Sequence, residues 1–180
     1  MKNAVIIHGW GANSESNWFP WLANELEQKG WRATVPDFPN SENPILTEWL
    51  EYFQKNVTID QDSILIGHSL GVPFILRLLE QSKEKIKAAF LVSGFERSLT
   101  IVEIENFVNK PFDWEKIKSV CKHFVVINSD NDPYIPLSIG KDFAKHLDTK
   151  LIVEHNAGHI NDMHAIFAYP RLRDRILALP

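Results

Sequence analysis

The stretch Gly67-His68-Ser69-Leu70-Gly71 places a serine between two glycines directly after an apolar run. A serine with a glycine two positions away on each side is typical of a sharp strand-to-helix turn that presents a nucleophile. The serine backbone is strained at such a turn, and a Cβ at either glycine position would collide with a neighbouring strand or helix. The N–H of Leu70 would lie at the amino end of the next helix, which favours developing negative charge. The pattern predicts that Ser69 is a nucleophile.

The same residues allow a simpler interpretation, a glycine-rich turn that binds nothing or binds a phosphate. A Walker-type phosphate loop is excluded, because no Gly-Lys-Ser/Thr sequence follows the glycines. A serine nucleophile needs a base that takes its proton and an acid that orients the base. The rest of the chain therefore decides between the two interpretations.

Two later loops supply these partners in the order serine, acid, histidine that is usual after such a turn. His159 follows Gly158 just beyond an apolar run, and the glycine would let the backbone bring the imidazole over Ser69. Asp132 stands four residues before Pro136, a proline expected to open a helix, and is the favoured acid. Asp130 competes for this role but is expected to cap its turn by accepting backbone N–H groups.

Stabilising an oxyanion requires a second backbone N–H, from the loop after the first strand. The stretch His8-Gly9-Trp10-Gly11 supplies it, and the N–H of Trp10 is expected to join that of Leu70. The imidazoles of His8 and His68 are expected to support these loops. No H-E-x-x-H helix or other common ligand spacing is present, so no metal site and no cofactor are expected.

Aromatic residues follow the strands in two stretches, 10–19 and 94–114, that could cover Ser69. Trp10 and Phe95 come directly after strand ends and are the expected walls of a small apolar acyl site. Because little chain remains to build a lid, the site is expected to be shallow and to accept short acyl chains.

The elements that must position these residues alternate along the chain between strands and helices. Apolar runs predict strands at 4–8, 32–36, 62–67, 88–93, 123–128 and 151–155. Periodic segments predict helices at 18–29, 45–55, 70–81, 101–107, 114–120, 138–147 and 162–177. Strands that are apolar on consecutive positions are buried on both faces. The expected fold is a three-layer α/β/α sandwich with a mostly parallel sheet of about six strands, forming one domain over 1–180.

Composition excludes several classes of function. The 180 residues carry 19 Lys and Arg against 23 Asp and Glu, and no basic stripe predicts nucleic-acid binding. No apolar segment is long enough to span a bilayer, and the first residues read as a strand rather than a secretory signal. The single cysteine, Cys121, fits a reducing, cytoplasmic setting.

With these motifs in place, the whole chain resembles the small serine hydrolases grouped with retinoblastoma-binding protein 9. The resemblance rests on Gly67–Gly71, Pro111–Lys118, Asp130–Pro136 and Gly158-His159. It implies a minimal α/β-hydrolase fold without a large cap domain and a triad of Ser69, Asp132 and His159. The retinoblastoma-type partner is not expected, because the sequence around Cys121 lacks the Leu-x-Cys-x-Glu pattern.

The residues together predict a serine hydrolase that cleaves a small carboxylic ester or related acyl substrate through an acyl-enzyme on Ser69. Two alternatives stay open. One is hydrolysis of an amide, aminoacyl or thioester substrate by the same triad, and the other is a non-catalytic interaction module on this fold.

Overall fold

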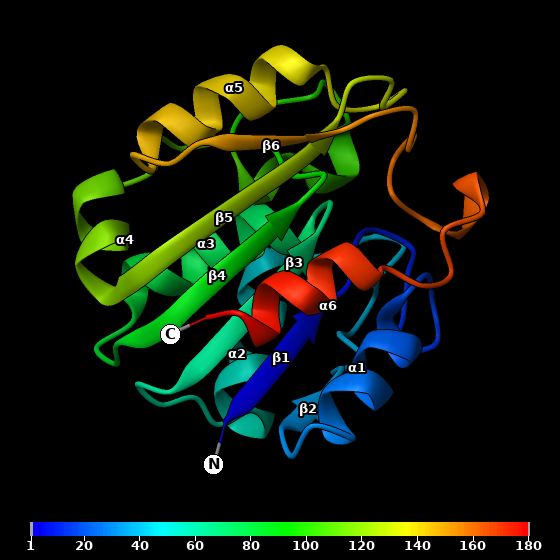
Figure 1. Cartoon of the computed structure of the whole chain (residues 1–180). Coiled ribbons are helices and arrows are strands. Elements are labelled where there is room, and N and C mark those ends of the chain that lie inside the picture. The colour runs from blue at the N-terminus through cyan, green and yellow to red at the C-terminus, as the bar shows by residue number, and fades with distance from the viewer. Residues whose placement is uncertain (1, 180) are drawn as a thin grey trace.

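The computed structural model describes residues 2–179 and contains one sheet of six strands, in the order β2-β1-β3-β4-β5-β6 (Figure 1). All five neighbouring pairs are parallel. The strands are β1 (Asn3–Ile7), β2 (Arg32–Thr34), β3 (Ser63–His68), β4 (Ile86–Val92), β5 (Cys121–Ser129) and β6 (Leu151–Glu154). Because parallel strands share one direction, the loops after them gather at one edge, where open α/β sheets bind ligands.

Helices cover both faces of the sheet. The α-helices are α1 (Phe19–Glu27), α2 (Leu46–Asn56), α3 (Gly71–Gln81), α4 (Trp114–Val120), α5 (Leu137–His146) and α6 (Pro170–Leu177). Two 3-10 helices are η1 (Val102–Phe107) and η2 (Asp162–His164). Figure 1 shows α1 and α6 in front of the sheet, and their buried side chains share one core with Ile6, Ile64 and Phe90. Helices α2, α3, α4 and α5 bury their side chains in a second core on the opposite face.

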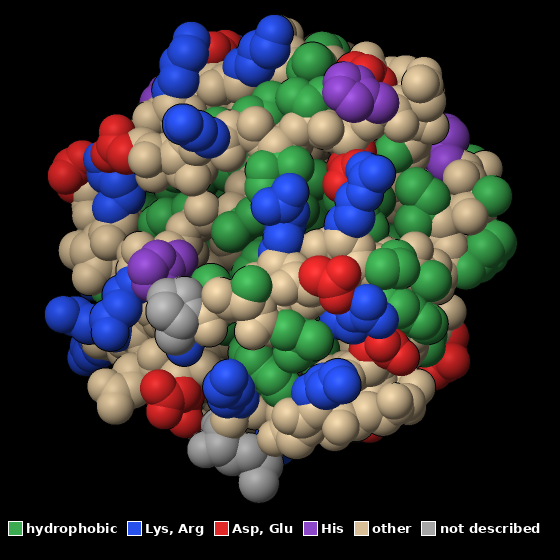
Figure 2. Space-filling view, viewed as in Figure 1, with side chains coloured by type: hydrophobic (Ala, Val, Ile, Leu, Met, Phe, Trp, Pro, Cys, Tyr) green, Lys and Arg blue, Asp and Glu red, His purple; other side chains and the backbone are tan. Residues whose placement is uncertain are grey.

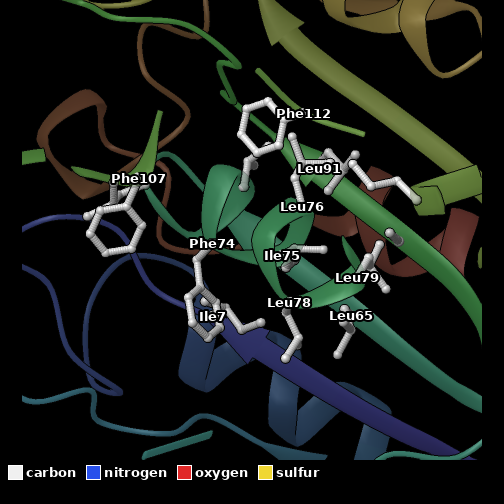
Figure 3. Close-up of a cluster of buried hydrophobic side chains, with 14 of the residues drawn as sticks. Ile7, Leu65, Phe74, Ile75, Leu76, Leu78, Leu79, Leu91, Phe107 and Phe112 are labelled. Carbon is white, nitrogen blue, oxygen red and sulfur yellow. The ribbon is translucent and has the colours of Figure 1, made fainter. Parts of the chain in front are cut away.

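The α/β/α architecture expected from the apolar runs is confirmed. Every residue of β1 and β3 is buried, as expected for central strands covered on both faces. Helix α3 is also deeply buried, and Figure 3 shows Phe74, Leu76 and Leu79 from this helix among side chains of the neighbouring strands. This packing fixes the start of α3 at the end of β3, which is where Ser69 lies.

The final helix differs from the sequence expectation of 162–177. The structure has the short 3-10 helix η2, then an irregular stretch, then α6 from Pro170. Ala165 has a left-handed backbone with φ of 58°, which ends η2. Tyr169 comes directly before Pro170, and a residue in that position disfavours helical angles, so α6 cannot continue from a preceding helix. The segment after His159 is therefore a loop at the site rather than a helix.

Within residues 2–179, no helix is long and apolar enough to cross a membrane. On the face shown in Figure 2, Lys and Arg side chains are interspersed with Asp and Glu side chains. The expectation that the protein binds no nucleic acid stays a prediction.

Candidate active site

Ser69 occupies the turn between β3 and α3 with φ of 52°, a left-handed value that is unfavourable for a side chain with a Cβ. Its own N–H is bonded to the carbonyl of Val92 at 3.0 Å. A Cβ on Gly67 would lie 2.8 Å from the carbonyl oxygen of Gly71, and one on Gly71 would lie 2.3 Å from that of Ile7. Both glycines are therefore required by close backbone packing, and the strained turn has the geometry of a nucleophile elbow.

His159 and Asp132 are joined by a hydrogen bond of 2.8 Å from Nδ1 to Oδ2. The Asp132 side chain has no exposed surface, and its Oδ1 accepts the N–H groups of Tyr134 at 2.9 Å and Ile135 at 3.0 Å. A carboxylate can only accept, so the His159 proton is on Nδ1 and Nε2 keeps its lone pair. This is the tautomer that a general base for Ser69 requires.

Asp130 has other partners. Its Oδ1 accepts the N–H of Asn156 at 2.9 Å, and its Oδ2 bonds Nδ1 of His155 at 2.5 Å. These two hydrogen bonds lower the pKa of Asp130, the one from the Asn156 N–H more than the one from His155. The Asp130 carboxylate thus ties β5 to β6, while the Asp132 carboxylate faces His159.

Two further side chains hold the loop that carries Asp132 against the loop that carries His159. Oδ1 of Asn131 accepts the N–H of Gly158 at 2.8 Å, and Oγ of Ser129 accepts the N–H of Ala157 at 3.1 Å. The hydroxyl of Ser129 in turn donates to Oδ1 of Asn131 at 2.8 Å. Sequence reasoning did not find these residues, and their only signal was their position at the end of β5 and just after it.

The backbone carbonyl of His159 is also fixed. It accepts Nε2–H of His68 at 2.9 Å and Oγ–H of Ser93 at 3.1 Å. Burial, assisted by the neighbouring His159, lowers the pKa of His68 to about 3, so its ring is neutral. His68 therefore links the turn at Ser69 directly to the loop that carries His159.

The residues around His159 have demanding backbone geometry. Gly158 has φ of 54°, and a Cβ there would lie 2.0 Å from Cδ2 of His164, whose Nδ1–H donates to Oδ1 of Asn161 at 2.7 Å. Ile160 has φ of 50°, which is rare for a β-branched residue, and its carbonyl accepts the indole N–H of Trp18 at 2.9 Å. The surrounding contacts impose this strained loop.

The two expected oxyanion donors, the N–H groups of Trp10 and Leu70, are bonded to no protein acceptor in residues 2–179. A Cβ on Gly9 would lie 3.1 Å from Cβ of Ser69, so the loop before Trp10 approaches the serine closely. His8 holds this loop, since its Nε2 accepts the N–H of Phe38 at 3.0 Å and its Nδ1–H donates to the Gly9 carbonyl at 2.8 Å. Burial lowers the pKa of His8, which keeps it neutral.

Two cavities meet at Ser69 and His159. The polar cavity has a volume of about 200 Å³ and is lined by Ser16, Asn17, Asp162 and residues 9–12. The inner cavity has about 280 Å³ and is mostly apolar, with Phe95, Leu99, Ile101, Ile104 and Ile135 in its wall. Trp10 lines both cavities and Phe95 lines the inner one, so both residues expected as walls share a cavity with Ser69.

Sequence reasoning missed most of the cavity walls. Leu99, Ile101 and Ile104 come from the stretch after β4. Asn161 and Met163 line both cavities, Met163 from the segment expected to be helical and Asn161 from the residue just before it. In the described residues, no group of three or more His, Cys, Asp or Glu side chains is arranged to hold a metal ion.

The sheet and the strained serine turn define the class of protein, an α/β-hydrolase fold, and comparisons with known proteins give the family. The family model described as "Serine hydrolase" matches residues 4–176, and the chain belongs to this family. The Bacillus subtilis protein YdeN is 36% identical over 177 residues, which cover 96% of this chain and 93% of YdeN. The serine hydrolase RBBP9 of Rattus norvegicus is 29% identical over 164 residues, covering 88% and 87%.

Solved structures agree on the fold. The crystal structure of the B. subtilis ydeN gene product superposes with a TM-score of 0.94 at 34% identity, covering 99% of this chain and 98% of that one. Est1E of Butyrivibrio proteoclasticus, in its complex with ferulic acid, has a TM-score of 0.77 at 16% identity, covering 99% and 89%, and this likeness concerns the fold alone. The resemblance to the retinoblastoma-binding protein 9 group is thereby confirmed.

Proposed function

We propose that this hydrolase cleaves a small carboxylic ester through an acyl-enzyme on Ser69. The observation that carries the proposal is the bond from Nδ1 of His159 to the fully buried Oδ2 of Asp132, with His159 and Ser69 on the wall of the same cavities. This arrangement leaves Nε2 of His159 as the free base beside the serine.

In the proposed reaction, Oγ of Ser69 attacks the acyl carbon while Nε2 of His159 takes its proton. The buried carboxylate of Asp132 stabilises the imidazolium and does not itself become protonated. The N–H groups of Trp10 and Leu70 bind the oxyanion, and the imidazolium then protonates the leaving group. Water, deprotonated by His159, releases the acid and restores Ser69.

The two cavities favour an assignment of the two halves of the substrate. The inner cavity is walled by aliphatic and aromatic side chains and suits the acyl group, while the polar cavity suits the leaving group. At about 30 Å³ per non-hydrogen atom, an inner cavity of 280 Å³ holds roughly nine such atoms, as in an octanoyl group. This capacity exceeds the short chains expected from sequence.

Ester is favoured over the thioester alternative by charge. No Lys or Arg is among the described residues that line either cavity, and Asp162 lines the polar one. A leaving group that carries several phosphates would find no cationic partner there.

A cytoplasmic location remains a prediction from the cysteine content. The thiol of Cys121 is buried, and burial raises its pKa to about 12, so this cysteine is unreactive.

Labelling with a fluorophosphonate probe tests the proposal and separates it from a non-catalytic interaction module. The wild type should be labelled at Ser69, as read by mass spectrometry of the peptide, and should hydrolyse p-nitrophenyl esters. Ser69→Ala should lose the label and at least about 10³-fold in kcat with unchanged folding. Ser138→Ala, on the exposed side of α5, should keep both. Near-normal turnover by Ser69→Ala would refute the mechanism.

A further inference from the structure

The inner cavity has an apolar neighbour that the proposed reaction does not use. An outer groove of about 440 Å³ lies beside α5 and is lined by Leu99, Ile101, Pro133, Tyr134, Pro136 and Ile139, with Ser98 and Thr100. Leu99, Ile101 and Tyr134 line both the groove and the inner cavity. The two hollows are therefore contiguous, and these three side chains form the boundary between them.

Tyr134 is the boundary residue that the fold holds least firmly. About half of it is exposed, at 49%, and its ring meets that of His159 edge-on at a centroid distance of 5.1 Å. Its hydroxyl makes no hydrogen bond with the described residues, whereas its N–H is fixed by Asp132. Only ring packing holds the side chain, so the ring can be removed while the backbone that supports Asp132 stays in place.

The chemistry of the groove matches that of the cavity. Leucine, isoleucine and proline side chains dominate its wall, and no Lys, Arg, Asp or Glu is among its lining residues in the described chain. An acyl chain whose carbonyl carbon is at Ser69 and whose first atoms fill the inner cavity would meet the Tyr134 ring next. Beyond that ring the wall continues to be apolar.

We propose that the inner cavity and the outer groove are two sections of one acyl path, and that the Tyr134 ring determines specificity by ending the path at the inner cavity. This proposal rests on the proposed ester hydrolysis. It names the substrate class as esters of medium-chain or aryl acids with an acyl group of up to about nine non-hydrogen atoms. Longer chains are rejected because the ring blocks the remaining apolar wall.

The test measures kcat/KM for p-nitrophenyl octanoate and dodecanoate, below micelle-forming concentrations. Each CH₂ that gains an apolar wall contributes up to about fourfold. Tyr134→Ala should raise the dodecanoate-to-octanoate ratio by about tenfold or more. Tyr134→Phe keeps the ring and should keep the wild-type ratio. Phe167→Ala removes another exposed ring, at 63%, that lines neither hollow, and should also keep it.

Binding separates the path from the reaction. In the Ser69→Ala background, the affinity for dodecanoic acid, measured by calorimetry, should increase when Tyr134→Ala is added. If esters are hydrolysed but the ratio is unchanged in Tyr134→Ala, or rises equally in Phe167→Ala, the path is refuted while the function stands. If no variant hydrolyses or labels but Tyr134→Ala tightens dodecanoate binding, the proposed function fails and the path stands.

Discussion

Asp132 and Asp130 lie two residues apart in one loop, yet their carboxylates have separate tasks. The Asp132 side chain is fully buried and accepts His159 Nδ1–H, whereas the Asp130 carboxylate accepts a backbone N–H and Nδ1–H of the exposed His155. The sequence favoured Asp132 because Pro136 follows it four residues later. In the structure, the Asp132 carboxylate lies against His159. Spacing alone could not separate them, because a loop carries no periodic signal for the directions of its side chains.

Asp132→Asn should lower kcat by about 10²- to 10⁴-fold, because the amide favours the wrong tautomer of His159 and cannot stabilise its cation. Asp130→Asn is the matched control, since it leaves the bond between Asp132 and His159 intact and should cost far less. Steady-state kinetics at pH 8 on variants of equal unfolding midpoint measure both. A larger loss in Asp130→Asn would reverse the assignment.

His68 makes the stability of the fold depend on pH. Its pKa is about 3 in the folded protein, lowered mainly by burial, against the ordinary value of 6.5 for a histidine exposed to water. Between these values the unfolded state binds the additional proton, so the free energy of unfolding rises with pH and falls on acidification below 6.5. Between pH 7 and pH 5 this group should remove about 2 kcal/mol of stability.

His68→Asn removes the titrating group and keeps a side chain that can donate to the His159 carbonyl. Urea unfolding at pH 7 and pH 5 should therefore show a smaller loss of stability for His68→Asn than for the wild type. The comparison cancels the other groups, such as His8 and Asp130, that titrate in both proteins. Equal losses in the two proteins would mean that His68 is not the buried neutral group described.

At the scale of elements, the loops after β5 and β6 form one unit that holds His159. Asn131 and Ser129 bond backbone N–H groups of the loop after β6, and His68 and Ser93 bond its carbonyl at His159. Asn17 adds a contact from the loop before α1, since its Oδ1 accepts the N–H of Asp162 at 3.2 Å. His159 is thus positioned from four loops at once.

Gly30 and Gly158 both have left-handed backbone angles. Comparing an alanine substitution at each separates the steric clash within this unit from the general cost of a Cβ at positive φ. Gly30→Ala, with φ of 78° and nothing within 4 Å of the new Cβ, should lower stability by about 1 kcal/mol. Gly158→Ala adds a clash with the His164 ring, so it should cost more stability and also displace His159. Activity should fall in Gly158→Ala and stay normal in Gly30→Ala, measured with equal amounts of folded protein.

The sequence predicted the strands well and the cavity walls poorly, for a physical reason. Strand ends follow from apolar runs cut by glycine and proline, so the positions of Ser69, Asp132 and His159 after strands were readable. The walls depend on turns whose side-chain directions carry no periodic signal. Asn161 and Met163 line both cavities from the segment around η2, which ends at the left-handed Ala165, and the only warning in the sequence was the pair Tyr169-Pro170.

Across the whole molecule, the loops around the polar cavity are acidic. Asp162 lines the cavity, Asp37 accepts the N–H of Ser14 at 2.6 Å, and the Glu42 carboxylate approaches Gly11. The formal net charge of -4 has the same sign. The net negative charge attracts cations over long range, and the Asp162 carboxylate attracts them within the cavity. Both therefore favour a cationic leaving group over an anionic one.

Butyrylcholine and its uncharged isostere 3,3-dimethylbutyl butyrate share an acyl group and a leaving-group shape. We expect kcat/KM to be about fivefold higher for the cation at low salt, since one opposite charge near 4 Å contributes about 1 kcal/mol in water. The preference should shrink at high ionic strength, because salt screens exposed charges. Asp162→Asn should remove most of it, whereas Asp62→Asn, exposed just before β3 at the opposite edge of the sheet, should preserve it. A preference that persists in Asp162→Asn and in high salt would instead place the leaving group outside the polar cavity.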